Sequence, residues 1–532
     1  MVIFIKKGRK EEMTFKKKLC CFSLIMIALI LIALPVSASI NYQLRETLTY
    51  NDISGNTEAS FLNPGLELRQ DFSLRAMGVN EEGWRYRASL SLRNVIDFEN
   101  NDYGSIDLRN YRLNLIKDQH DISLGRVYAD FGQYLMVQNM TGLVYLNRDW
   151  DMSVSAGRVR PYSEGRSLER NALGLSKEFE ANNPFSDLPG IDRLIFTTGF
   201  SMVKDTPHDS EILEAEESRV ISAELNAGLS PNLNLQTMVS RSEYYQDINL
   251  EANIGTAVKS ELLYQIPGLR LTGGFERVTP EFKNLSSPIS ADRIEFFSRA
   301  RMSISESLRI DTSYRTYQDN LDNQKARTTQ NQLFNISFNQ RDLDDRNKEL
   351  KYGLKGRIVT NDDNTVSTQN ITGDIQYKGR YEDLDYRLNF DYNWINNLLD
   401  PSANRNRYVA AVDLKGRYYL GDKATSPFFN YKIESDAPVS GAANMTYTAN
   451  LGSSLRIDYD NSINARIRYV SQNKADDSDD SQKTTLAFTY NRNIPRYNAR
   501  LEISAERTNN VFVDQSENYQ ETVLRIVFNK RF

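Results

Sequence analysis

The stretch WRYRASLSLRNVIDF, from Trp84 to Phe98, alternates between two kinds of side chain. A period of two predicts a β-strand, because successive side chains of a strand point to opposite faces. One face is apolar except for an asparagine and carries Trp84, Tyr86, Ala88, Leu90, Leu92, Asn94, Ile96 and Phe98. The other is mostly polar and carries Arg85, Arg87, Ser89, Ser91, Arg93, Val95 and Asp97.

The same alternation recurs far downstream, so it is a property of the whole chain. It returns over residues 385–394, 445–458 and 497–506. Counting such runs predicts about 26 strands, within a range of roughly 22 to 28. Amphipathic patterns with the 3.6-residue period of a helix are absent over any useful length. The sequence therefore predicts an all-β fold.

The predicted connections alternate in length. Those after even-numbered strands are mostly short, as at 117–121 and 267–268, and those after odd-numbered strands are mostly longer, as at 205–218 and 280–292. The segment 180–191 breaks this rule. Short turns at one end and long loops at the other are typical of antiparallel membrane barrels.

The first 38 residues have the layout of a secretory signal peptide. Lysines and arginines precede an apolar run from Cys20 to Leu34, and the small residues Ser37 and Ala38 end a cleavage motif. We expect residues 1–38 to be removed, leaving residues 39–532 as the mature chain. The alternative, an uncleaved membrane anchor, is weaker because the apolar run is short for a spanning helix.

Composition excludes several classes of protein. The 65 basic and 70 acidic residues nearly cancel, which argues against nucleic-acid binding. Two cysteines and two histidines exclude haem attachment, iron–sulfur clusters and cysteine-rich zinc sites, so we expect no cofactor. The mean hydropathy of −0.55 excludes a bundle of transmembrane helices but permits a membrane barrel, where only alternate residues meet lipid.

The C-terminus carries a second fold signal. Leu524, Ile526 and Phe528 share a face with Phe532, the last residue. This pattern resembles the C-terminal signature of Gram-negative, porin-like outer-membrane β-barrels, although Lys530 departs from it. The resemblance covers about ten residues and implies a closed antiparallel transmembrane barrel in the bacterial outer membrane. It also implies that this strand is the insertion signal read by the barrel-assembly machinery, with lipid and lipopolysaccharide as surroundings.

We expect the barrel, without a plug or extra domain, to be the whole mature chain. A barrel of 26 strands would be roughly 50 Å across, so we expect inward-folded loops, a flattened section or another molecule in the lumen. The candidate lumen-facing residues carry both signs, which suits a hydrated wall better than a tuned filter. They are Arg85, Arg87, Arg93, Arg309, Asp311, Arg315, Arg387, Asp391, Arg466, Arg468, Arg500 and Glu502.

The leading functional hypothesis is a porin-like channel for hydrophilic solutes. The alternative is a sheath or scaffold that holds a protein partner in its lumen, similar to a porin–cytochrome conduit or a polymer export component. An enzyme is not expected, although His120 and His208 lie near acidic residues. The acidic tracts 342–345 and 476–480 lack the spacing of a calcium loop, so we expect solvated turns and no metal site.

Overall fold

The computed structural model describes residues 39–98, 106–159, 168–182, 191, 193–207, 215–246, 251–342, 345, 347–361, 366–397, 400–439, 441–475 and 480–532. The predicted signal peptide, residues 1–38, lies outside the described residues. Within the described ranges, no helix has the length and apolar content needed to cross a membrane.

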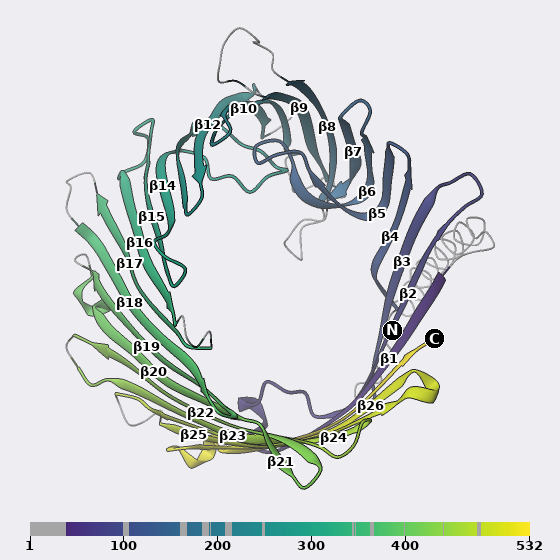
Figure 1. Ribbon diagram of the computed structural model, residues 1–532, viewed down its shortest axis with the longest axis vertical. Coiled ribbons are helices and arrows are strands. Elements are labelled where there is room, and N and C mark those ends of the chain that lie inside the picture. Colours follow the sequence, from purple (N-terminus) through teal and green to yellow (C-terminus); the bar gives the residue numbers. More distant parts are fainter. Residues whose placement is uncertain are drawn as a thin grey trace, which may run out of the picture.

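The described chain is a single antiparallel sheet rolled into a ring (Figure 1). Its strands are β1 (Ser39–Gly55), β2 (Gly65–Val79), β3 (Arg85–Asp97), β4 (Asp107–Lys117), β5 (His120–Asp130), β6 (Val137–Asn147), β7 (Met152–Val159), β8 (Leu168–Asn182), β9 (Arg193–Pro207), β10 (Glu217–Ser230), β11 (Leu233–Tyr245), β12 (Asn253–Ile266), β13 (Leu269–Val278) and β14 (Arg293–Ser303). They continue as β15 (Leu308–Asp319), β16 (Thr329–Arg341), β17 (Glu349–Asn361), β18 (Val366–Tyr381), β19 (Leu384–Asn397), β20 (Arg405–Gly416), β21 (Tyr418–Leu420), β22 (Lys423–Pro438), β23 (Asn444–Arg456), β24 (Asn461–Asn473), β25 (Ser481–Ile494), β26 (Ala499–Phe512) and β27 (Tyr519–Arg531).

The ring closes between its first and last strands. β1 pairs antiparallel with β27, from Gln43 opposite Arg531 to Gly55 opposite Tyr519. The short β21 and the preceding β20 both pair with β22, so these two segments occupy one position in the ring. The 27 strand segments therefore make a closed 26-strand barrel, which confirms the predicted all-β architecture and strand number.

The two ends of the barrel differ. At one end the strands are joined by tight turns, such as 118–119 between β4 and β5 and 267–268 between β12 and β13. Asp118 (φ 49°) and Gly268 (φ 78°) adopt left-handed conformations that such turns require. At the other end the connections are mostly longer, as at 279–292 between β13 and β14. The connection between β8 and β9 follows an even-numbered strand and so belongs to the short-turn end, although it is longer than the other turns there.

Alternate residues form an outer apolar face. Large apolar side chains remain exposed around the whole ring, for example Ile221 (61%), Phe296 (52%) and Leu451 (55%). One polar row interrupts this face across β1, β2 and β3, where Gln70 donates to Glu46 (2.9 Å) and Asn94 donates to Gln70 (3.3 Å). An exterior this apolar requires a nonaqueous solvent, and only a closed sheet satisfies every backbone polar group there.

Candidate functional site: two inner loops on the barrel wall

Two connections from the long-loop end fold into the ring and pack together on its wall (Figure 1). They are residues 131–136, between β5 and β6, and residues 279–292, between β13 and β14. We call these segments the inner loops. The face of the sheet that they contact is the inner face, and alternation assigns the other residues of each strand to the outside.

The inner loops bury an apolar cluster against the wall. Tyr134 and Phe282 are 0% and 2% exposed, and their rings meet edge to face with centroids 6.1 Å apart. Leu135 lies beside them, at 2% exposed. The cluster is completed by inner-face residues of four adjacent strands, Val220, Met238, Ala257 and Val278. Burial of this apolar surface favours the inward-folded conformation of both loops.

Glycines on the inner face make room for the loops. A Cβ added at Gly174 of β8 would lie 2.5 Å from the ring of Phe131, and one added at Gly199 of β9 would lie 2.3 Å from a methyl group of Leu135. At Gly255 of β12 the added atom would lie 2.1 Å from the backbone nitrogen of Phe282. The wall beneath the loops is therefore shaped to receive them.

Hydrogen bonds join the two loops to each other. The side chain of Asn284 donates to the carbonyl oxygens of Tyr134 (2.6 Å) and Leu135 (3.0 Å). The Ser286 hydroxyl also donates to the Leu135 carbonyl (2.7 Å), as does the Ser201 hydroxyl of β9 (2.7 Å). These contacts satisfy backbone groups that the loops would otherwise bury unpaired, a costly arrangement.

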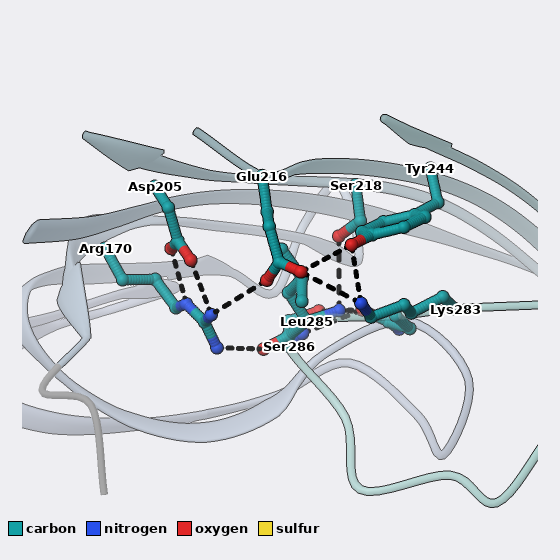
Figure 2. Close-up of polar contacts among 9 residues, drawn as sticks. Arg170, Asp205, Glu216, Ser218, Tyr244, Lys283, Leu285 and Ser286 are labelled. Carbon is teal, nitrogen blue, oxygen red and sulfur yellow. Dashed lines mark hydrogen bonds and ion pairs between the residues drawn. The ribbon is translucent and has the colours of Figure 1, made fainter. Parts of the chain in front are cut away.

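A charged network fastens the longer inner loop to the wall (Figure 2). The Nζ of Lys283 donates to the Tyr244 hydroxyl (2.6 Å) and to Glu216 (3.0 Å), and Tyr244 also donates to Glu216. On the other side of Glu216, the guanidinium of Arg170 forms two hydrogen bonds with Asp205, at 2.6 and 2.7 Å. We call these five residues the latch.

The latch holds its loop residues in their charged forms. Burial acts to raise the pKa of Glu216, but hydrogen bonds from Tyr244 and Lys283 outweigh it and leave this pKa below its usual value. Burial acts to lower the pKa of Lys283, but its bonds with the same two partners leave that pKa raised. Each charge therefore stabilises the other at neutral pH.

The predicted lumen-facing residues lie on the same inner face when the cross-strand register is followed around the ring. The structure brings four of these residues together in two ion pairs, each within one strand: Arg309 with Asp311 (3.1 Å), and Arg500 with Glu502 (3.7 Å). Three others meet acidic residues that were not predicted: Arg93 with Asp71 (2.6 Å), Arg315 with Glu295 (3.1 Å) and Arg466 with Glu506 (3.6 Å). Contact of any of them with a solute stays a prediction.

The predicted insertion signal lies at the closure of the barrel. Leu524 and Ile526 on β27 are 46% and 43% exposed on the outer face, which Phe528 shares. The ring of Phe532 stacks on Tyr42 of β1, with centroids 4.5 Å apart. Lys530, the departure from the expected pattern, places its Nζ over the same Phe532 ring (4.1 Å).

The histidine and acidic candidates do not assemble into a site among the described residues. His120 begins β5, and its Nδ1 lies 2.8 Å from the Tyr145 hydroxyl. His208 and most of the tract 476–480 lie outside the described residues. Within the described ranges, no group of three or more potential metal-ligating side chains is found.

Sequence reasoning gave inward-folded loops as one of three alternatives but did not identify which loops fold inward. A signal was present, because part of the inner face of β8–β12 carries a run of small residues, such as Gly174, Ser201 and Val220, where a hydrated wall would carry charge. The loop FGQYLM, residues 131–136, is itself unusually apolar for an exposed connection. Together these two departures indicate a covered stretch of wall.

Comparisons with known proteins find only distant structural similarity. No protein-family model matches the sequence, and no curated protein matches it. The translocation pore of the P pilus usher PapC is similar over 93% of this chain and 99% of that one, with 10% identity and a TM-score of 0.35. The siderophore receptor PirA from Pseudomonas aeruginosa is similar over 94% and 81%, with 11% identity and a TM-score of 0.39.

A third similar structure is OccAB4 from Acinetobacter baumannii, over 93% of this chain and 98% of that one, with 10% identity and a TM-score of 0.29. Similarity at this level specifies neither a family nor a transported molecule. The class of the protein follows from its own architecture. A closed 26-strand antiparallel barrel with an apolar exterior and a polar interior is a bacterial outer-membrane β-barrel.

Proposed function

We propose that the mature chain is an outer-membrane channel for hydrophilic solutes, narrowed on one side by the two inner loops. The observation that carries this proposal is the division of the inner wall. The part of the wall beneath the inner loops carries small apolar side chains, such as Val220 and Ala257. The uncovered part over β14–β18 carries charged side chains, such as Arg299 and Lys355. An uncovered charged wall suits water and dissolved solutes.

The orientation of the channel follows from the unlike ends of the barrel. Short turns face the periplasm in bacterial barrels of this class, and long loops face outside. The inner loops both start from the long-loop end. In this orientation they narrow the channel from its external mouth, where arriving solutes meet them first.

Export requires the removal of the leader. We propose that signal peptidase cleaves after Ala38, so that β1 starts at the mature N-terminus. N-terminal sequencing of the protein purified from outer membranes should begin SINYQ. A purified chain that still begins near Met1 would contradict this proposal and favour the uncleaved anchor.

Planar bilayers test the channel. The purified chain should give steady conductance steps, and a variant in which residues 281–291 are replaced by a short glycine–serine linker should give larger steps. A barrel that folds and inserts but stays electrically silent would refute the channel. A silent barrel that also co-purifies with a cytochrome or another protein would favour the sheath.

A further inference from the structure

The inner wall beside the loops has a basic hollow of about 800 Å³. Its lining comes from β12–β18 and includes six cationic residues but only two acidic ones, Glu261 and Asp311. The cationic residues are Arg270, Arg299, Arg301, Arg315, Lys355 and Arg357. The whole chain has a formal charge of −5, so this stretch of wall departs from the overall balance. The sequence-based expectation that neither sign dominates therefore does not hold here.

The strand register sets the cationic residues among hydrogen-bonding neighbours. Arg299 of β14 lies between Thr272 of β13 and Ser313 of β15. Further along the same row, Lys355 of β17 lies between Asn335 and Thr372. Diagonal neighbours on adjacent strands lie about 7–8 Å apart, so the long side chains of Arg270 and Arg299 can reach one small molecule.

Three of these guanidinium groups have no carboxylate partner among the described residues. Arg301 pairs with Asp311 (2.6 Å) and Arg315 with Glu295 (3.1 Å), so their charges are compensated. Arg357 donates to the neutral amide oxygen of Asn331 (2.7 Å). Within the part of the chain that the structure describes, Arg270 and Arg299 have no ion pair, and both are exposed to the interior.

Guanidinium groups without a carboxylate partner repel each other when they share one hollow. Elsewhere on the same wall, arginines do have acidic partners. The planar guanidinium matches carboxylate and phosphate oxygens with two parallel hydrogen bonds. A multivalent anion would therefore satisfy donors that the protein itself leaves open.

We propose that this hollow binds multivalent anionic solutes that carry phosphate or carboxylate groups, and that it selects such solutes for passage. The selection rests on the proposed channel function, but the binding does not. Arg270 and Arg299, diagonal neighbours across β13 and β14, supply the donors for the anion, and Arg357 on β17 adds positive charge to the same hollow. Thr272 and Ser313, which lie beside Arg299, supply neutral hydrogen bonds that fix the position of the anion.

Binding is measured by isothermal titration calorimetry of inorganic tripolyphosphate into the mature barrel in a zwitterionic detergent at low salt. The triple variant R270Q/R299Q/R357Q should bind at least about tenfold more weakly, because it removes the charge-assisted hydrogen bonds of Arg270 and Arg299 and the nearby positive charge of Arg357. The matched control is R468Q/K483Q/R525Q, which removes the same charge from the inner face of β24, β25 and β27. We expect its affinity to stay within about twofold of the unaltered barrel.

Both variants must first migrate as folded barrels in unheated gel electrophoresis. If the two triple variants lost the same affinity for tripolyphosphate, the site would be overturned. Binding would then depend on the total charge of the inner wall and not on this hollow. Absence of binding to the unaltered barrel would overturn it too.

A second measurement separates this inference from the channel itself. In a planar bilayer with a salt gradient, the unaltered barrel should be anion-selective, and R270Q/R299Q/R357Q should lose much of that selectivity. A silent bilayer with the calorimetric contrast intact would refute the channel and leave the anion site standing. Steady conductance without the calorimetric contrast would refute the site and leave the channel standing.

Discussion

Replacing Gly255 by alanine should lift the longer inner loop off the wall without disturbing the strand beneath it. Gly255 lies on the inner face of β12, opposite Ser242. Alanine is compatible with an extended strand and carries a smaller entropic cost than glycine. The added methyl group, however, would lie 2.1 Å from the nitrogen and 2.2 Å from the Cα of Phe282. Both atoms belong to the backbone, so the loop itself must move.

The size of the effect follows from what the loop loses. Ordinary contacts need more than about 3.4 Å, so the backbone at residue 282 must retreat by over about 1 Å. Phe282 is 2% exposed and would leave its pocket. Losing the contacts of a buried phenylalanine costs about 3–5 kcal/mol. At about 1.4 kcal/mol per tenfold, the lifted conformation becomes at least about 100-fold more populated.

Thiol labelling measures this shift. The only cysteines, Cys20 and Cys21, lie in the proposed signal peptide, so V220C would place a single thiol in the mature chain. Val220 is 0% exposed beneath the inner loops, and cysteine is a small apolar replacement. A membrane-impermeant maleimide should label V220C slowly in the parent barrel and much faster with G255A, which should also conduct more.

The matched control is G373A in β18, where an added Cβ meets no heavy atom within 4 Å. It should change neither the labelling rate nor the conductance. If V220C reacts as slowly with G255A as without it, the packing of Phe282 on Gly255 does not hold the loop in place.

Three further predictions concern the latch, the closure and the exterior. Glu216 has a lowered pKa, so its stabilising charge is present above pH 4.5 and is lost as the pH falls through the lower folded value. V220C labelling, measured with a pyridyl disulfide that reacts in acid and compared with a free thiol at the same pH, should therefore accelerate only in stronger acid. E216Q should label faster at neutral pH and lose this acid response. F532A removes the stack on Tyr42 and should lower the yield of folded barrel in outer membranes, seen in unheated gels, whereas F61A, at a fully exposed loop position, should not; equal yields would refute a role for the terminal ring in assembly. E46L removes a carboxylate from the outer apolar face and should raise the free energy of unfolding in lipid vesicles by about 1 kcal/mol, measured by urea titration. A loss of stability would contradict this and show that the hydrogen bonds of the polar row stabilise the barrel.

The alternation of residues such as Trp84 to Phe98 was enough to predict strands, their faces and their approximate number. It was enough because the two faces of each strand meet different solvents, so apolar and polar residues alternate with a period of two. The parity of the connections likewise reflects local turn geometry. Both signals are readable one hairpin at a time.

The inner loops could not be predicted in the same way. Asn284 and Tyr134 are 150 residues apart, and their hydrogen bond exists only because eight strands between them curve into one wall. The basic hollow has a similar origin. The sequence shows both Arg301 and Arg299, but only the register shows that Asp311 neutralises the first and that Thr272 and Ser313 flank the second.

The closure between β1 and β27 dictates an order of biogenesis. Residues 43–55 find half of their backbone partners in residues 519–531, which are translated long after them. Until that tail has been translated and exported, the first strand presents a bare edge that hydrocarbon would not tolerate. A polypeptide truncated before β27 thus leaves this edge of β1 unpaired and cannot close into a barrel.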